Sequence, residues 1–300
     1  MNLETAKGLC ARILSREPES VERCGVGIAN YVYKVECAGE KYILRCSTDN
    51  DYSETAAWLR RLAALDIPVP RVMEHGEADG YRYLLLTYIP GQDIGLVYRQ
   101  LSENEKREIA REVVEIQKKA SKLEPEGIGP DWSWTSFIEG MLDRAAGRIL
   151  DNGYFSVERV DRLRAETERF KGYFSKVKPV AYLDDITTKN LLVHNGRLSG
   201  VIDVDWIGVG DPLTQPALTC MALMDLECDT DYAGYILEGM EPKGAQRRAF
   251  IFYLLMYCVD FMGERGTTFM DKKIEVNGEI IRRLNDIYDR LWVRLNDMPV

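Results

Sequence analysis

Hydrophobic and polar positions in the first ninety residues alternate in a way that predicts a small sheet with one helix. Residues 21–47 mix β-branched and aromatic residues with small ones and break at glycines, which indicates three antiparallel strands. Residues 53–70 place apolar side chains at helical spacing, with Ser53 as the expected cap and Pro68 as the stop. Residues 81–91 predict a further strand that ends at a Pro-Gly break.

From residue 102 onward, the apolar positions recur with the period of an α-helix. A capping box opens the first helical segment, and paired charges follow along it. The predicted helical segments are residues 102–123, 133–150, 156–177, 211–224, 245–262 and 279–296. This change of pattern predicts an α+β protein with an N-terminal part at 1–90, a linker at about 87–95 and a larger, mostly helical part at 91–300.

Two short strands interrupt the helical part. Residues 190–194 and 197–206 flank Asn195–Gly196, a dipeptide that supplies the positive φ angles of a two-residue hairpin turn. Asp185 precedes the first of these strands, and Asp203 lies near the end of the second. We therefore expect the hairpin to bring these polar positions together in space.

Composition narrows the functional classes. The chain is 46% hydrophobic and 29% charged, and no run of about 18 apolar residues is present to cross a bilayer. The formal net charge of −9 argues against general nucleic-acid binding, which needs clustered Lys and Arg. Backbone N–H groups, one or two bases and a divalent metal can still hold an anionic nucleotide. The surplus of acid favours a cationic second ligand.

Cysteine and histidine usage excludes further kinds of site. The seven cysteines are scattered without a CxxC pair, which fits reduced thiols better than a disulfide framework or a zinc site. Residues 1–17 predict an amphipathic helix without the long apolar segment of a secretion signal, so a cytoplasmic location is expected. With His75 and His194 as the only histidines, a Ser-His-Asp or Cys-His nucleophilic site is excluded.

The spacing of three polar residues indicates phosphoryl transfer. Asp185 stands five residues before Asn190, and Asp203 follows after the hairpin, which is the order of catalytic acid, metal-binding amide and metal-binding acid in kinases. A triphosphate needs a magnesium ion to neutralise its charge, and Asn190 and Asp203 offer the oxygen ligands that magnesium takes. Asp185 then faces the acceptor hydroxyl, whose proton it would take. The spacing to Asn190 selects Asp185 over its neighbour Asp184.

Together with their surroundings, these residues resemble the aminoglycoside phosphotransferase and choline kinase superfamily. Its signature reads approximately HGDxxxxNxL followed by IDWxxxxxGDP, and this chain has "LDDITTKNLL" followed by "VIDVDWIGVGDP". The likeness covers residues 20 to 225, including "ETAAWLRRLAALDIPVPRVMEHG" and "YLLLTYIPG". The resemblance implies a two-lobed protein-kinase-like fold with an antiparallel-sheet N-lobe that holds ATP. It further implies that the backbone of Thr87 to Ile89 receives the adenine.

The chain departs from the pattern of this family in two places. Leu183 and Asp184 replace the signature histidine and glycine, so packing would be kept while a polar contact is lost. On the third strand, Arg45 stands where kinases generally use lysine against the α- and β-phosphates. We interpret Arg45 as a functional variant that makes forked contacts to phosphate and to Glu54.

Several of these residues have a second interpretation. Asp185 could serve as a loop cap, Asp203 could be merely solvated, and Asp205 is either a second metal ligand or a structural acceptor. Asp211 is expected to cap a helix, and Arg45 and Glu54 could be surface groups. The glycine motif "CGVGIANYVY" at 24–33 fits a plain hairpin turn as well as a phosphate-covering loop. The acidic residues of 225–231, namely Asp225, Glu227, Asp229 and Asp231, form either a solvated loop or an anionic rim for an amine-bearing substrate.

The sequence as a whole predicts a small-molecule kinase. It would move the γ-phosphoryl group of ATP, with Mg²⁺, to a hydroxyl of a cationic acceptor such as an aminoglycoside or an amino alcohol. The replacements at Leu183 and Asp184 motivate one alternative, a nucleotide-binding regulatory protein of the same fold with impaired catalysis. No nucleic acid, membrane or obligate protein partner is expected.

Overall fold

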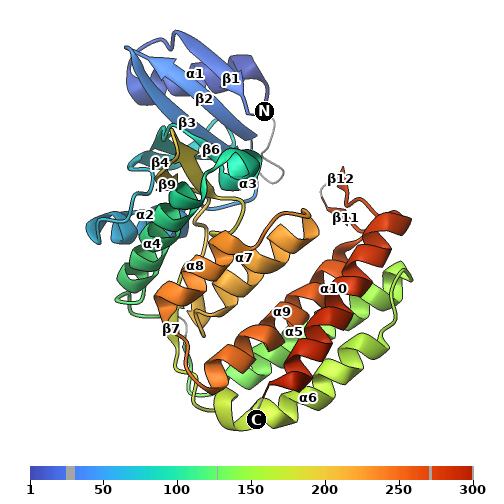
Figure 1. Ribbon diagram of the computed structural model, residues 1–300. Helices are drawn as coiled ribbons and strands as arrows, with labels where there is room; N and C mark the ends of the chain where they lie inside the picture. The colour runs from blue at the N-terminus through green and yellow to red at the C-terminus, as the bar shows by residue number, and fades with distance from the viewer. Residues whose placement is uncertain (25–30, 127, 270–271, 299–300) are drawn as a thin grey trace. The chain divides into compact units, whose positions relative to one another are not determined.

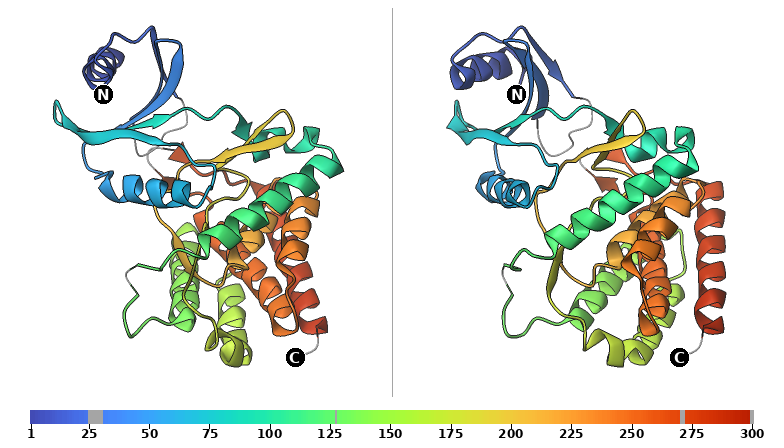
Figure 2. Two further views of the ribbon diagram at one scale, coloured as in Figure 1. Left: turned by 90° about the vertical axis from the view of Figure 1, so that its left-hand side faces the viewer. Right: turned by 60° about the vertical axis from the view of Figure 1, so that its left-hand side comes forward.

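The computed structural model describes residues 1–24, 31–126, 128–269 and 272–298, and these form two compact units (Figures 1 and 2). The first unit consists of Met1–Leu96 together with Asn190–Ile207, and the second consists of Val97–Lys189 together with Gly208–Val300. Neither unit is one continuous stretch. The short elements α3 (Ile94–Val97) and η1 (Tyr98–Gln100) lie where the chain leaves the first unit.

A five-stranded antiparallel sheet forms the centre of the first unit. Its strands, in the order β1-β2-β3-β5-β4, are β1 (Ser20–Arg23), β2 (Tyr31–Cys37), β3 (Glu40–Ser47), β5 (Tyr81–Thr87) and β4 (Val72–Ala78). The three strands predicted within 21–47 and the strand predicted at 81–91 are thus confirmed. The sequence pattern did not reveal β4, because this edge strand mixes polar and apolar residues without regular alternation and has a bulge between Val72 and Glu74.

Helix α1 (Leu3–Leu14) covers one face of this sheet, as Figure 1 shows. Its apolar residues pack on strand residues spaced two apart, and this core consists of Ala6, Leu9, Cys10, Tyr33, Val35, Leu44, Cys46, Tyr83 and Leu85. Because successive side chains of a strand point to opposite faces, Arg45 of β3 points away from that core. Helix α2 (Ser53–Ala64) begins at Ser53 itself, so the expected cap is the first helical residue, and Asp51 accepts the Ser53 N–H at 2.9 Å.

A hairpin from the middle of the chain completes the first unit. Strands β8 (Leu191–His194) and β9 (Arg197–Val201) pair antiparallel, and β6 (Gln92–Asp93) pairs with β8. Asn195 and Gly196 form the turn with φ of 50° and 73°, which confirms the predicted two-residue turn. The sequence grouped this hairpin with the helical part; the structure joins it to the first unit through β6 and through Pro68, whose carbonyl accepts the Val201 N–H.

The second unit is mostly helical, and the long helices predicted from the sequence are confirmed. They are α4 (Glu103–Ala120), α5 (Trp134–Asn152), α6 (Glu158–Phe174), α7 (Thr214–Asp225), α9 (Ala245–Glu264) and α10 (Gly278–Asp297). Helix α8 (Asp231–Met240) lies outside the predicted segments. Helix α9 contacts α5, α6, α7 and α10 (Figure 1), and its side chains from Arg248 to Val259 are all buried. The predicted capping box of α4 is present at Ser102 and Glu105. None of the helices in the described ranges is long and apolar enough to cross a membrane.

Two short strand pairs accompany these helices. Strands β7 (Val180–Tyr182) and β10 (Gly208–Gly210) pair antiparallel, with Gly208 opposite Tyr182. Strands β11 (Thr268–Phe269) and β12 (Lys272–Lys273) form the other pair. The β7–β10 pair closes the two ends of segment 183–207, so this segment leaves the second unit and returns to it at one place.

Gly200 of β9 lies close to Ile89 and Pro68, so we expect Gly200→Ala to destabilise the first unit. An added Cβ would lie 2.6 Å from Cδ1 of Ile89 and 2.9 Å from the Pro68 carbonyl oxygen. Overpacking of this kind costs about 1–3 kcal/mol, measurable by urea unfolding. Gly8→Ala is the matched control, because Gly8 lies on exposed helix with nothing within 4 Å of the new methyl. The control should raise stability by about 0.5–1 kcal/mol; equal effects of the two changes would contradict the packing.

Candidate functional site

The hairpin brings the two predicted metal ligands together. The Ile202 N–H donates to the Asn190 carbonyl at 2.9 Å, so Asn190 and Asp203 lie at adjoining ends of the two strands. The Asn190 N–H donates to Oδ1 of Asp93 at 2.9 Å, which fixes the start of β8. The predicted hairpin turn brings Asn190 and Asp203 together, and the structure places both residues in the first unit.

Both of these residues have a left-handed backbone. The φ angles are 64° for Asn190 and 57° for Asp203. This conformation costs about 1–2 kcal/mol per L-residue and is borne most easily by Asn and Asp. Such strain persists where the surrounding structure holds it, and it often accompanies a functional site. The two side chains therefore take directions that an ordinary extended strand would not give them.

An amide oxygen and a carboxylate are ligands that fit magnesium. Within the described ranges, no group of three or more His, Cys, Asp or Glu side chains is arranged to hold a metal ion. A site with one amide and one acid is nevertheless typical of magnesium, which retains several waters and uses substrate phosphates as its other ligands. The donor set at Asn190 and Asp203 is therefore of the kind that serves a metal-bound nucleotide.

Arg45 connects the central sheet to the segment that follows the hairpin. Its guanidinium donates to both carboxylate oxygens of Asp205 at 2.9 and 2.8 Å, and it lies 3.2 Å from Asp203. The arginine side chain is only 9% exposed, against 52% for Asp203 and 42% for Asp205. The ring of Tyr52 lies under the guanidinium, with its centroid 5.5 Å from Cζ. Arg45 is thus a buried, forked cation and not a surface group.

The acid that holds Arg45 differs from the one predicted. Glu54 was expected to steady Arg45, but Glu54 is exposed on the first turn of α2. Asp205 makes the bidentate contact instead, and the next helix residue, Thr55, donates its hydroxyl to Asp205 at 3.2 Å. The helical register explains the difference, because Thr55 is on the buried face of α2 and Glu54 is not. Of the two roles open for Asp205, the contacts favour that of structural acceptor.

Arg45, Asp203 and Asp205 form a cluster in which burial and ion pairing have opposite effects on the pKa values. Burial raises the pKa of Asp203 above its ordinary value, and the positive charge of Arg45 opposes the shift. Burial by itself would lower the pKa of Arg45, but its hydrogen bonds and charge contacts with Asp205 and Asp203 raise it above the ordinary value. One cation therefore faces two carboxylates, and the cluster carries a net negative charge to which a metal ion could bind.

In the segment that was predicted to receive the adenine, two backbone N–H groups already make hydrogen bonds within the protein. The Thr87 N–H donates to the Arg71 carbonyl at 3.0 Å, and the Tyr88 N–H donates to the Lys41 carbonyl at 3.1 Å. These two N–H groups are used within the protein, and the predicted contact of the Thr87 to Ile89 backbone with adenine stays a prediction. The glycine motif predicted at 24–33 falls largely on residues 25–30, which lie outside the described residues.

Asp185 lies in the second unit, on loop 183–189 between β7 and the hairpin. The residue is exposed, whereas Leu183 is 2% and Ile186 is 2% exposed. Asp184 is partly buried, and a Cβ on Gly208 would lie 3.0 Å from its Cβ. The two adjacent acids are therefore in different environments, and Asp185 has the more accessible position. Its predicted catalytic role stays a prediction.

Two buried glutamines hold this loop, and sequence analysis missed both. Gln117 of α4 accepts the Leu183 N–H at 2.9 Å and donates to the Leu183 carbonyl at 2.7 Å. Gln215 of α7 donates to the Ile186 carbonyl at 2.7 Å. The available signal was a polar residue within the apolar face of each helix, where Gln117 is 5% and Gln215 is 0% exposed.

Asp211 has a larger structural role than the helix cap that was predicted. Its carboxylate accepts the hydroxyls of Tyr173 at 2.5 Å and Tyr253 at 2.8 Å, as well as the Leu213 N–H at 3.1 Å. Helix α7 begins at Thr214, so Pro212 does not occupy its first position. The buried acid thus fixes the start of α7 to α6 and α9.

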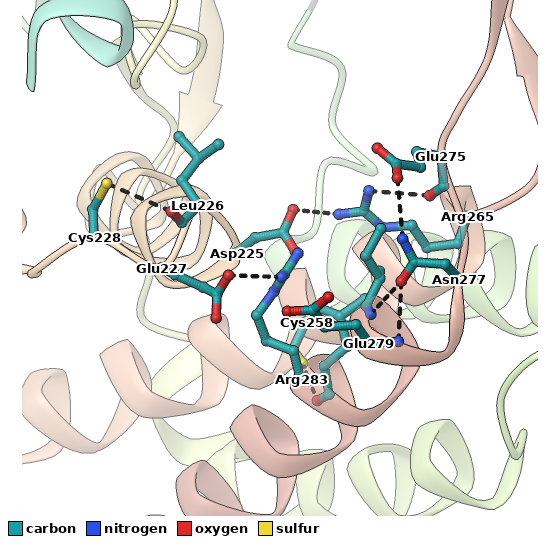
Figure 3. A network of polar contacts seen from close by, with 12 residues as sticks. Asp225, Leu226, Glu227, Cys228, Cys258, Arg265, Glu275, Asn277, Glu279 and Arg283 are labelled. Atoms are coloured by element: carbon teal, nitrogen blue, oxygen red, sulfur yellow. Dashed lines mark hydrogen bonds and ion pairs between the residues drawn. The ribbon is translucent and has the colours of Figure 1, made fainter.

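The acidic segment 225–231 is largely neutralised within the second unit. Figure 3 shows the guanidinium groups of Arg265 and Arg283 directed at the carboxylate of Asp225. Arg283 also lies 3.2 Å from Glu227. Internal ion pairs thus account for these acids, and they do not support an anionic rim.

Asp229 is paired in the same way. Its carboxylate accepts Nζ of buried Lys106 at 2.8 Å and the hydroxyl of Tyr98 at 2.8 Å. Partial burial raises the pKa of Asp229, but these hydrogen bonds outweigh that effect and leave the pKa below its ordinary value. Asp229 therefore joins α4 to the start of α8 through this ion pair, while its side chain remains 48% exposed.

Comparison with known proteins identifies several relatives. The model of the phosphotransferase enzyme family matches residues 20–250. An aminoglycoside 3'-phosphotransferase of Streptomyces fradiae is 28% identical over 211 residues, which cover 66% of this chain and 75% of that protein. The family match agrees with the resemblance recognised in the sequence motifs.

Solved structures extend the comparison to the fold. A ternary complex of a thermostable mutant of aminoglycoside phosphotransferase APH(4)-Ia with AMP-PNP and hygromycin B has a TM-score of 0.64 at 16% identity, with 97% of each chain covered. A GDP complex of an aminoglycoside 2'-phosphotransferase-IIIa mutant has a TM-score of 0.67 at 15% identity, covering 99% of this chain and 97% of that one. These likenesses confirm the predicted kinase-like fold class.

We expect Asp225→Asn to destabilise the second unit, because it leaves two arginines beside a neutral side chain. The side chains of Asp225, Arg265 and Arg283 are 14%, 12% and 18% exposed. Removing one partner from a buried ion pair typically costs about 3–5 kcal/mol, which urea unfolding would detect. Asp131→Asn serves as control, since Asp131 is exposed and its change should stay within about 0.5 kcal/mol. A loss no larger than that of the control would contradict a structural role for this network.

Proposed function

Because the chain belongs to the phosphotransferase enzyme family, we propose that it transfers the γ-phosphoryl group of ATP to a hydroxyl of a small cationic molecule. The observation that carries the proposal is the convergence of Asn190 and Asp203 in left-handed conformations, with Asn190 five residues after the exposed Asp185. This is the order and chemistry of groups that phosphoryl transfer requires.

Nucleotide binding is assigned to residues of the first unit. Asn190 and Asp203 would hold Mg²⁺, which when bound supplies positive charge to the phosphates. Arg45, held by Asp205, would add its positive charge to the phosphate site. The backbone of Thr87 to Ile89 would receive the base. Solved relatives contain AMP-PNP in one case and GDP in another, so ATP and GTP are both to be compared.

Asp185 is assigned to the acceptor. Its exposed carboxylate would accept a hydrogen bond from the acceptor hydroxyl, orient that oxygen toward phosphorus and take up its proton. Catalysis then rests on positioning and electrostatic stabilisation, without a covalent enzyme intermediate. All seven cysteines are free, which suits a reducing compartment such as the cytoplasm.

A cationic acceptor of the aminoglycoside or amino-alcohol type agrees with two observations. The chain carries a formal charge of −9, which attracts cations over a range of about 10 Å. The similar protein from Streptomyces fradiae is an aminoglycoside phosphotransferase, and APH(4)-Ia binds hygromycin B in its ternary complex. Three of the four acids in segment 225–231, namely Asp225, Glu227 and Asp229, are paired internally, so this segment is not assigned the main role in recognition.

A second candidate is nucleotide binding without phosphoryl transfer. The replacements at Leu183 and Asp184 favour it, since the family signature has histidine and glycine there. A panel of hygromycin B, gentamicin, a macrolide, choline, a sugar and homoserine, incubated with labelled ATP or GTP, distinguishes the two functions. Labelled product supports the kinase; saturable magnesium-dependent nucleotide binding with no product from any acceptor supports the second candidate.

Asp185→Asn tests the proposed acceptor-side base. The amide keeps the size of the side chain but cannot take the proton, so we expect kcat to fall by about 10²–10⁴-fold. The Kd for Mg·ATP, measured by titration calorimetry, should stay within about twofold, because Asp185 is assigned no nucleotide contact. Asp184→Asn is the neighbouring control and should leave more activity than Asp185→Asn. A parent-like kcat in Asp185→Asn would contradict the assigned role.

Asp205→Asn and Glu54→Gln together test which acid positions Arg45. Loss of the Asp205 charge weakens a forked contact to a buried guanidinium, so we expect Mg·ATP to bind about 10-fold more weakly. Glu54 is exposed, and its change should alter the same Kd by less than about twofold. The reverse order of effects would restore Glu54 as the partner of Arg45 in the nucleotide-bound protein.

A further inference from the structure

The loop that carries Asp185 is fastened to the second unit by uncharged side chains. Gln117 makes two hydrogen bonds to a single residue, since its Oε1 accepts the Leu183 N–H at 2.9 Å and its Nε2 donates to the Leu183 carbonyl at 2.7 Å. Both Gln117 and Leu183 are buried. The amide therefore supplies the donor and acceptor that a neighbouring strand would otherwise provide.

Gln215 makes the second attachment, and within the described ranges one of its own polar atoms is left without a hydrogen bond. Its Nε2 donates to the Ile186 carbonyl at 2.7 Å and to Oγ1 of Thr219 at 3.1 Å. Its Oε1 has no hydrogen-bond partner among the described residues, although Gln215 is 0% exposed. An unsatisfied buried acceptor costs about 1–3 kcal/mol. The glutamine supplies a donor to the buried Ile186 carbonyl, which an apolar side chain would leave unpaired, while its own side-chain acceptor has no partner in the described part of the chain.

These attachments bracket Asp185. Leu183 lies two residues before it and Ile186 one residue after it, and both are buried while Asp185 is exposed. We propose that Gln117 and Gln215 are positioning residues, which fix the backbone on both sides of Asp185 and thereby the direction of its carboxylate. This inference rests on the proposed function.

Neutral amides suit this purpose for two reasons. A misplacement of about 1 Å at a catalytic group can cost about 100-fold in rate, so the backbone on both sides must be fixed. A lysine or arginine in the same places would add its own charge close to the carboxylate and alter its basicity. Position 183 itself is a leucine in this chain, and its side chain offers no polar contact. The loop therefore depends on the backbone bonds from Gln117.

The experiment uses the full chain and three variants, Gln117→Met, Gln117→Glu and Gln215→Met. Gln246→Met is the matched control, because Gln246 is exposed on the first turn of α9. Three quantities are measured for each: hydrogen exchange of peptides spanning 183–189, the Kd for Mg·ATP, and kcat for ADP release with a mixture of hygromycin B, gentamicin and choline.

We expect Gln117→Met and Gln215→Met to speed exchange within 183–189 and to lower kcat by about 10- to 100-fold. The Kd for Mg·ATP should remain within about twofold, and Gln246→Met should match the parent in all three measurements. Faster exchange with a parent-like kcat would overturn the positioning role. Unchanged exchange would overturn the attachment itself.

The Gln117→Glu variant separates positioning from general destabilisation. A carboxylate at this place accepts the Leu183 N–H but repels the Leu183 carbonyl, whereas a protonated carboxyl reproduces both bonds of the amide. Because burial raises the pKa of a carboxyl group, protonation near neutral pH is expected. The kcat of this variant relative to the parent should rise about threefold or more between pH 8 and pH 6. A pH-independent ratio would count against the proposal.

The outcome also separates this inference from the proposed function. A parent that releases no ADP above background with any acceptor in the mixture removes the proposed function, and the positioning role falls with it. An active parent whose glutamine variants remain equally active removes only the positioning role.

Discussion

The buried guanidinium of Arg45 is the interaction on which the first unit depends. A cation with a side-chain exposure of 9% must have acidic partners near it, and Asp203 and Asp205 supply them from a segment 160 residues away in sequence. The first unit is consequently assembled from two separate stretches of chain. The same contact sets the location of Asp203, which is also the predicted metal-binding acid, so folding of the sheet and formation of the site are coupled.

The hairpin places the two predicted metal ligands at adjoining ends of its strands. The Asn195–Gly196 turn fixes the register of β8 and β9. In this register the Asn190 carbonyl accepts the Ile202 N–H, and Asp203 is the next residue along the chain. The left-handed φ angles at Asn190 and Asp203 are then imposed by pairing on one side and by Arg45 on the other. Gly200 allows β9 to approach Ile89 and Pro68 closely. A larger residue there would displace the strand that carries the ligands.

Charge serves different purposes in the two units. Arg45 in the first unit is a buried cation among acids, whereas the loop bearing Asp185 is held by the amides of Gln117 and Gln215. Elsewhere in the second unit, Asp225 is paired with two arginines, as Figure 3 shows, and stabilises the helices. The net charge of −9 therefore does not locate a ligand site, because several acids are already neutralised where they stand.

Periodicity and local motifs were sufficient for much of this protein. The strands within 21–47, the capping box at Ser102 and Glu105, and the Asn195–Gly196 turn depend on neighbours in sequence, so residue type alone predicts them. The motifs "LDDITTKNLL" and "VIDVDWIGVGDP" likewise indicated the family. An edge strand such as β4 has no such signal, since its polar residues face solvent and its strand character comes from pairing with β5.

Contacts between distant segments required the tertiary structure. The sequence predicted Glu54 as the partner of Arg45, and only the burial of Thr55 together with the return of residues 203–205 reveals Asp205 in its place. Asp225 and Asp229 likewise become structural only when Lys106, Arg265 and Arg283 reach them from other parts of the second unit. A sequence specifies which groups carry charge and which carry hydrogen-bond donors. Which of them meet depends on the path of the whole chain, because a partner for a buried charge can come from any part of it.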